Sequence, residues 1–226
     1  YMDVDLDDPS NARYSVSLGK DYRMRLRTSV AKLRRWLADW GVEEPSRLRG
    51  FTFGGAPGGG VPATNIAIPY PSATQDLHYE GELVVAIGRG GANIAADDAL
   101  SHIWGYAAGN DLTRRDLQAE AKATRRPWDM SKGFDQSAVV GLIHPQSALA
   151  DGTLTLQVDG VTHQTTLLSK MIWNVAGVIA HLSRLVTLAP GDLIFTGTPA
   201  GVGPLQRGQT CTVTIDGLSP ATVTIF

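Results

Sequence analysis

The sequence predicts an α+β protein that is mainly β, with helices at the periphery of the sheets. Short segments rich in β-branched and apolar residues recur between turn residues, and they predict strands at 83–87, 137–143, 153–158, 193–196 and 210–215. The pair Asp159-Gly160 separates 154–158 from 161–166 and is a strong hairpin signal. The chain has no internal repeat and no regular alternation of strands and helices, which argues against a parallel α/β fold.

Helices are expected around this β-rich core. From Ile66 onward, we expect them near 97–104, 113–123 and 171–185. Before the core, an amphipathic helix is expected from Asp21 to Trp40, ending at Gly41. Its apolar face repeats at three- and four-residue spacing and consists of Val30, Leu33, Trp36, Leu37 and Trp40. We interpret it as a helix docked on the protein rather than a membrane or nucleic-acid element.

These elements divide the chain into three parts. We expect residues 1–53 to form an N-terminal helical appendage, 54–65 a Gly/Pro-rich loop or linker, and 66–226 the domain that carries the candidate catalytic residues described below. With 226 residues and 43% hydrophobic content, the chain can form one domain of ordinary size with a hydrophobic core and an appendage.

Composition excludes several classes of protein. The net charge of −2 argues against a nucleic-acid partner. The chain contains no run of eighteen apolar residues, so we expect no membrane span. The single cysteine, Cys211, excludes an intrachain disulfide. The acidic start of the chain is opposite in charge to a signal peptide, and we expect a cytoplasmic protein.

The most informative segment is His78-Tyr79-Glu80-Gly81-Glu82, followed by the apolar run LVVAIG. Residues two apart on a strand point to the same face, so Glu80 and Glu82 are expected side by side. Two adjacent carboxylates repel unless a cation lies between them, and Mg²⁺ prefers carboxylate oxygens. The alternative is an exposed strand end with two solvated charges.

Three later segments carry further candidates. GYAAGNDLTRRDLQ places Asp111 after small residues, WDMSKGFD places Lys132 among aromatic and turn residues, and PGDLIFTGTPAGVG runs from a strand into a glycine-rich turn. The spacing of that turn is not GxxxxGK[ST], which argues against a nucleotide-binding role.

In this order, HYEGELVVAIG, GYAAGNDLTRRDLQ, WDMSKGFDQSA and PGDLIFTGTPAGVG resemble the fumarylacetoacetate hydrolase family. The resemblance covers Ile68 to Phe226, and the segment RRPWDMSKGFDQSA is most similar to the bacterial fumarylpyruvate hydrolase, or acylpyruvase-type, subgroup. It implies a mixed β-sandwich roll with peripheral helices, commonly assembled as a homodimer.

The resemblance also implies roles for individual residues. Glu80, Glu82 and Asp111 match the metal-binding carboxylates, with Mg²⁺ or Mn²⁺ as the cation and Ca²⁺ as a further candidate. The matching catalytic residues are the active-site lysine Lys132, the substrate-holding Arg115 and Gln118, and Thr198, which contacts the substrate carboxylate.

Each residue also has a simpler interpretation. Lys132 could be a surface lysine, and Arg115 could belong to a solvated helix face with local ion pairs. Thr198 could only shape the turn before Pro199. His78 could lie on the face of Glu80, although a lone histidine at a strand start is more often structural.

One family feature is not found. Members usually carry an N-terminal lid motif, N-Y-x-x-H-x-x-E, whose His–Glu pair activates water, followed by F-F-x-K-P. Residues 11–14 do not match it, no histidine precedes His78, and 49–60 read RGFTFGGAPGGG. Either the chain departs from the family here, which we favour, or a lid segment is missing from a sequence that starts at Tyr1.

We therefore expect an enzyme that acts on a small anionic oxo acid. The leading hypothesis is hydrolytic C–C cleavage of an acylpyruvate-type 1,3-dicarbonyl acid such as fumarylpyruvate. The alternatives are a decarboxylase, hydratase or isomerase that works through a metal-bound enolate, or a non-catalytic binding homologue. A lid motif in the coding sequence would favour hydrolysis.

Overall fold

The structure is a computed structural model, and it describes residues 64–146 and 148–226. The expected appendage at 1–53, including the helix at 21–40, lies outside the described residues, as does most of the expected loop at 54–65. The first strand, β1 (Thr64–Ile68), begins two residues before the expected start of the catalytic domain.

One layer is a five-stranded sheet in the order β1-β13-β12-β8-β9. Its other strands are β8 (Thr153–Val158), β9 (Val161–Leu167), β12 (Thr210–Ile215) and β13 (Ala221–Ile225). β1 runs parallel to β13, and the other pairs are antiparallel. The predicted β8–β9 hairpin is confirmed, since Asp159 and Gly160 both have positive φ, as a tight hairpin turn requires.

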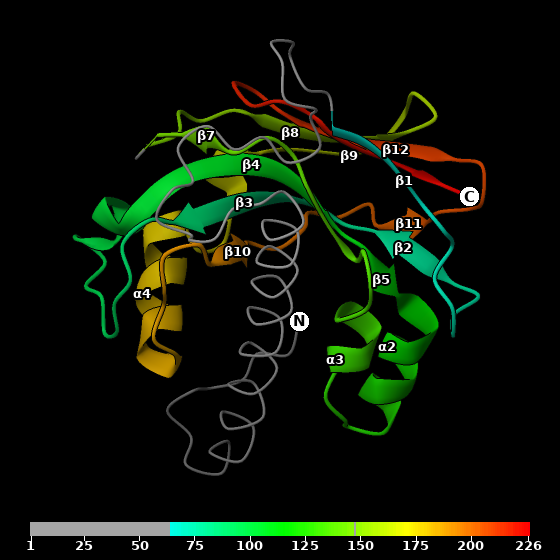
Figure 1. The fold of residues 1–226 in the computed structure, drawn as a ribbon, viewed down its shortest axis with the longest axis horizontal. Helices are drawn as coiled ribbons and strands as arrows, with labels where there is room; N and C mark the ends of the chain where they lie inside the picture. Colours follow the sequence, from blue (N-terminus) through cyan, green and yellow to red (C-terminus); the bar gives the residue numbers. More distant parts are fainter. Residues whose placement is uncertain (1–63, 147) are drawn as a thin grey trace, which may run out of the picture.

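The second layer is a sheet in the order β10-β3-β4-β6 that packs against the first (Figure 1). It contains β3 (Gly81–Ile87), β4 (Ile103–Asp111), β6 (Ala138–Val140) and β10 (Leu193–Phe195), and β7 (His144–Pro145) also pairs with β4. β3 is buried throughout. Leu83, Val85 and Ile87 join the main core, whereas Val84 and Ala86 join a smaller cluster on the opposite face. Side chains therefore alternate between two dry faces.

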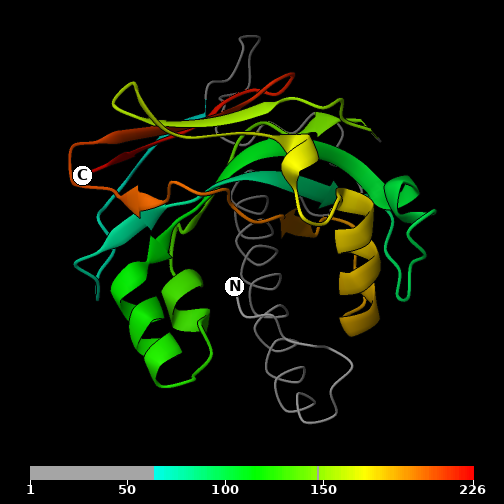
Figure 2. The same ribbon diagram turned by 180° about the vertical axis from the view of Figure 1, so that it is seen from behind.

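A small third sheet continues from the second in the order β11-β2-β5. It consists of β2 (Leu77–Tyr79), β5 (Thr113–Arg114) and β11 (Gly203–Pro204). The helices α2 (Arg115–Ala123) and α3 (Asp129–Lys132) lie together beside β5, while α4 (Val175–Leu185) lies at the opposite end of β3 and β4 (Figures 1 and 2). Two 3₁₀ helices, η3 (Ala99–His102) and η4 (Leu168–Lys170), complete the described part.

The predicted fold class, mainly β with peripheral helices, is confirmed, and one element differs clearly. The helix expected at 97–104 is only the short η3, and the chain then forms the long strand β4. The glycines of β4 have low strand propensity, so the sequence does not predict a strand here, but close neighbours leave no room for a larger residue at these positions. A Cβ on Gly105 would lie 2.3 Å from the His144 carbonyl oxygen, and one on Gly109 would lie 2.4 Å from Val84 Cγ2.

The other helix boundaries differ by a few residues. The segment expected at 113–123 begins with β5 before α2, and the helix expected at 171–185 begins at Val175. The Asn174 side chain caps it by accepting a hydrogen bond from the Gly177 N–H at 2.8 Å. In the described part of the chain, no helix has the length and apolar character needed to cross a membrane.

Candidate metal centre

Three carboxylates meet where β2, β3 and β4 come together. Glu82 is the second residue of β3 and pairs with Gly109 on β4, so Asp111, two residues further on, lies on the same sheet face. Both lie on the face of the smaller apolar cluster, away from the five-stranded sheet. Oxygen atoms of Glu80, Glu82 and Asp111 lie within 4.8 Å of one another.

Glu80 reaches this cluster by a route that differs from the sequence prediction. It does not share a strand with Glu82, because the ladder breaks at Glu80, between β2 and β3. Two hydrogen bonds fix the break: the Asp111 N–H donates to the Glu80 carbonyl oxygen at 2.9 Å, and the Glu80 N–H donates to Asn110 Oδ1 at 2.9 Å. The expected pairing of the two carboxylates is therefore achieved across a strand break.

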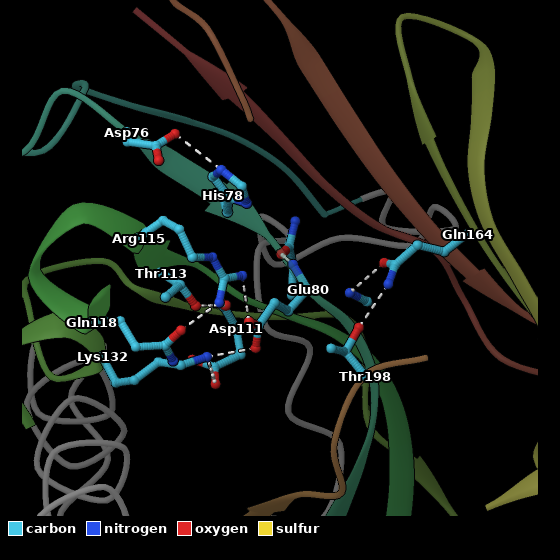
Figure 3. Close-up of polar contacts among 12 residues, drawn as sticks. Asp76, His78, Glu80, Asp111, Thr113, Arg115, Gln118, Lys132, Gln164 and Thr198 are labelled. Atoms are coloured by element: carbon cyan, nitrogen blue, oxygen red, sulfur yellow. Dashed lines mark hydrogen bonds and ion pairs between the residues drawn. The ribbon is translucent and has the colours of Figure 1, made fainter. Parts of the chain in front are cut away.

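Two basic residues contact the cluster on one side, which we call the cationic side (Figure 3). The Lys132 side chain is 4% exposed, and its ammonium donates to Glu80 Oε2 at 2.5 Å and to Asp111 Oδ2 at 2.8 Å. Arg115 Nη2 donates to Glu80 Oε1 at 2.7 Å, and its Nη1 donates to Gln118 Oε1 at 2.6 Å. The interpretation of Lys132 as a surface lysine is wrong, since the side chain is buried between carboxylates.

The cationic side is held in place by the start of α2. This helix follows β5 directly, and Asp116 anchors it by accepting hydrogen bonds from Thr74 Oγ1 at 2.6 Å and the Gln75 N–H at 2.9 Å. Because Arg115 precedes Asp116, this anchor aims its guanidinium at Glu80. The interpretation of Arg115 as part of a solvated ion-pair face is therefore wrong.

The opposite side is formed by the turn after β10, Gly197-Thr198-Pro199, together with Gln164 of β9; we call it the turn side (Figure 3). The Gly197 N–H donates to Glu82 Oε2 at 2.7 Å. Gln164 Nε2 donates to Thr198 Oγ1 at 2.8 Å and to the Pro199 carbonyl oxygen at 2.9 Å. Thr198 thus lies beside the cluster without a hydrogen bond to its carboxylates among the described contacts.

The two sides impose opposite shifts on the carboxylate pKa values. Burial favours the neutral form of Glu80, but Lys132 and Arg115 outweigh it and lower its pKa below the ordinary value. Burial raises the pKa of Glu82 to about 8, and the neighbouring Asp111 carboxylate adds to the rise. Without a cation, the cluster therefore holds one carboxyl that retains its proton at neutral pH.

The donor set suits a hard divalent cation. Mg²⁺, Mn²⁺ and Ca²⁺ prefer carboxylate oxygens, and three buried or half-buried carboxylates supply them here. The cluster carries three potential negative charges against two positive charges from Lys132 and Arg115. The Glu82 carboxylate, which has no cationic hydrogen-bond partner among the described residues, gains most from a metal ion.

Sequence reasoning missed three residues that shape this site. Asn110 orients Glu80 and donates from Nδ2 to the buried Cys211 sulfur at 3.3 Å. Asp116 anchors α2, and Gln164 supports the turn. Asn110 and Asp116 stand beside motif residues, which is a usable signal, whereas Gln164 lies in a polar strand with no signal of its own. His78 contacts Asp76 Oδ1 at 2.9 Å, in keeping with a structural role.

Comparison with known proteins gives consistent results. A sequence model described as the fumarylacetoacetate (FAA) hydrolase C-terminal family matches residues 53–226. A fumarylpyruvate hydrolase from Ralstonia sp. is 42% identical over 160 residues, which are 70% of this chain and 83% of that protein. A mitochondrial oxaloacetate tautomerase from Arabidopsis thaliana is 41% identical over 157 residues, covering 68% of this chain and 70% of that protein.

The fold comparison points the same way. The crystal structure of fumarylpyruvate hydrolase from Pseudomonas aeruginosa in complex with Mn²⁺ and pyruvate superposes with a TM-score of 0.68 at 44% identity. The match covers 71% of this chain and 73% of that chain. A divalent cation in that relative agrees with the carboxylate cluster found here.

Proposed function

Since this chain belongs to the fumarylacetoacetate hydrolase family, we propose that it is a metal-dependent hydrolase that cleaves a C–C bond in an acylpyruvate-type acid such as fumarylpyruvate. The observation that carries the proposal is the buried cluster of Glu80, Glu82 and Asp111 with Lys132 inserted between two of its members. Carboxylates for a cation and a fixed ammonium together suit a substrate whose reacting oxygens become negatively charged.

The proposed reaction balances as a hydrolysis. The oxygen of water bonds to the acyl carbonyl carbon, and the bond from that carbon to the adjacent CH₂ breaks. Its electron pair moves to the pyruvate fragment as an enolate, which takes up a proton. Fumarylpyruvate and water thus give fumarate and pyruvate.

The residues of the cationic side have donors available for such a substrate. Two of the three Lys132 N–H groups serve Glu80 and Asp111, which leaves the third for a substrate oxygen. Gln118 accepts from Arg115 through Oε1, so its NH₂ group is directed to other acceptors. Both side chains are buried, which gives their hydrogen bonds to a bound oxyanion added strength.

A divalent cation held by Glu80, Glu82 and Asp111 would supply Lewis acidity toward the substrate oxygens. We propose Mg²⁺ or Mn²⁺, with Ca²⁺ as a weaker candidate. The proposal further includes a homodimer in the cytoplasm with a small anionic oxo acid as its ligand and neither nucleic acid nor membrane as a partner.

A second reaction class is favoured by one observation. Among the described residues, the side chains hydrogen-bonded to the carboxylate cluster are cationic, and none supplies a base that could activate water. Tautomerisation or decarboxylation of a 2-oxo acid needs a stabilised enolate but no activated water. The similarity to an oxaloacetate tautomerase supports this alternative, and a non-catalytic binding protein is a third outcome.

The test is an assay with fumarylpyruvate and with oxaloacetate, each with Mg²⁺ or Mn²⁺ and with a chelator. Metal-dependent formation of fumarate and pyruvate, followed by NMR, would support hydrolysis. Exchange of deuterium into oxaloacetate or pyruvate without acylpyruvate cleavage would favour the alternative. Metal binding without either activity would point to a binding protein.

A further inference from the structure

Gln164 connects the metal-binding segment to the threonine turn. It projects from β9 in the five-stranded sheet and is 1% exposed, although the neighbouring residues of that strand are exposed. Its Oε1 accepts a hydrogen bond at 2.9 Å from the N–H of Gly81, the residue between Glu80 and Glu82. On its other side, its Nε2 donates to Thr198 Oγ1 (Figure 3) and to the Pro199 carbonyl oxygen.

These partners determine how the amide is oriented. The Gly81 N–H can only donate, so the atom facing it is the amide oxygen. The Pro199 carbonyl can only accept, so the atom facing it is the NH₂ group, and this same nitrogen contacts Thr198 Oγ1 at 2.8 Å. The Thr198 hydroxyl is therefore an acceptor toward Gln164, and its single proton remains to be donated elsewhere.

The backbone around Gln164 is shaped for this contact. A Cβ on Gly81 would lie 3.2 Å from Gln164 Oε1 and 3.1 Å from Leu156 Cδ1, so a glycine gives the amide close access to the backbone. Gly201, with φ +99°, brings the end of the turn so near β9 that a Cβ would lie 2.3 Å from the His163 carbonyl oxygen. The Gly197 N–H then bonds to Glu82 and closes a ring of contacts.

We propose that Gln164 is a positioning residue that makes Thr198 a hydrogen-bond donor toward the carboxylate of the substrate. A hydroxyl that accepts from a buried amide cannot also donate to it, so its proton is oriented toward an anionic acceptor in the site. Gln164 fixes this orientation relative to the metal-binding segment through Gly81. This inference rests on the proposed function, because it assumes an oxo acid ligand at the cluster.

The experiment compares Gln164→Met with Thr198→Val and with the double variant, all in the Mn²⁺-loaded protein. Gln164→Met keeps the length of the side chain but removes its amide. The expected result is about tenfold weaker pyruvate binding by calorimetry and about tenfold higher KM for fumarylpyruvate, as for loss of a hydrogen bond to a charged group. For both single variants, the loss of pyruvate affinity is expected to exceed any fall in turnover or in Mn²⁺ affinity, because the amide and the hydroxyl act on the carboxylate and neither is a metal ligand.

Two further readouts separate positioning from a general structural role. If Gln164 acts through Thr198, the double variant should bind pyruvate about as weakly as Thr198→Val alone, whereas independent effects would multiply to about 100-fold. Pyruvamide, which lacks the carboxylate charge, should bind all variants with nearly equal affinity. The matched control is Gln157→Met, which removes an exposed Gln–Thr hydrogen bond to Thr162 on the same hairpin and should change none of these values.

A second variant covers the case in which Gln164→Met does not fold. Gln164→Glu keeps the shape and the acceptor for Gly81 but offers Thr198 another acceptor, so it should also weaken pyruvate binding. Multiplicative effects, wild-type pyruvate affinity in both variants, or equal losses for pyruvate and pyruvamide would overturn the proposal. If wild-type protein neither binds pyruvate nor turns over fumarylpyruvate, the proposed function fails instead.

Discussion

Glu80 and Glu82 are two residues apart in the sequence, yet the structure gives them different surroundings. Glu80 accepts from Arg115 and Lys132 on the cationic side, and its pKa is lowered. Glu82 meets the turn side, where its hydrogen bond comes from the Gly197 N–H, and its pKa rises to about 8. The protein itself thus balances the charge of Glu80, whereas Glu82 needs a bound cation to be ionised at neutral pH.

This difference suggests a division of labour. The cationic side holds its charges in place through two short helices and can present donors to a substrate. The turn side contributes neutral donors from the backbone and from a buried amide, which cost little desolvation. Substitutions on the two sides should therefore have different signatures in metal binding, turnover and stability.

The largest effect is expected from Glu82→Gln. The amide removes the one carboxylate that lacks a cationic partner, so Mn²⁺ affinity should fall by about 100-fold or more. The metal-free variant should melt close to wild type at pH 7, because the Glu82 carboxyl without a cation already holds its proton and is neutral there. Calorimetry and thermal melts measure both, and Glu120→Gln on the exposed face of α2 is the control. An Mn²⁺ affinity equal to that of wild type would contradict a metal site at these carboxylates.

Lys132→Met should affect turnover more than metal binding. Loss of one fixed donor at a developing oxyanion costs about 100- to 1,000-fold in turnover, while the three carboxylates remain for Mn²⁺. Steady-state kinetics with fumarylpyruvate and a parallel Mn²⁺ titration separate the two effects. Lys122→Met, an exposed lysine on α2, should behave as wild type. Wild-type kinetics in Lys132→Met would deny the cationic side a catalytic role.

Metal affinity should depend on pH through the turn side. With the Glu82 pKa raised to about 8, the metal-free site holds a proton at neutral pH that the cation must displace. Affinity should therefore rise by up to about tenfold per pH unit below pH 8 and level off above it. Calorimetry in buffers of different ionisation enthalpy should show release of about one proton at pH 7. A constant affinity between pH 6 and 8 would contradict the raised pKa.

A smaller effect is expected when the turn is displaced from β9. Gly201→Ala adds both the strain of φ +99° and a contact with the His163 carbonyl oxygen, and Gly208→Ala adds strain alone, at φ +86° with nothing within 4 Å. Left-handed strain costs about 1–2 kcal/mol, so Gly208→Ala should lose that much stability and Gly201→Ala more. Denaturant melts compare the two. Equal losses would mean that the turn can move away from β9 freely.

Much of the site could be predicted because its residues lie in four compact motifs. A strand pattern predicts Glu80 and Glu82, the resemblance to the family implies Asp111 and Lys132, and the structure brings all four together. The strand break at Glu80 could not be predicted, because it is set by Asn110 from a neighbouring strand. Gln164 was out of reach for a similar reason, since its partners lie 83 and 34 residues away in the sequence.

The fold followed the sequence where β-branched residues mark the strands, as in β3, β8 and β12. It departed from the prediction at β4, whose GYAAGN segment lacks these residues. There the glycines are needed because His144 and Val84 approach the strand closely. This is a tertiary requirement that local strand propensity cannot reveal. The site depends on this strand, because β4 ends at Asp111.

The central claim is that the carboxylates at the ends of β3 and β4 hold a divalent cation. The most direct measurement is anomalous diffraction from crystals of the full chain grown with Mn²⁺. We predict one strong anomalous peak at about 2.0–2.6 Å from oxygens of Glu80, Glu82 and Asp111. If crystals saturated with Mn²⁺ show no anomalous peak among these three carboxylates, or show peaks only elsewhere in the protein, the claim is contradicted.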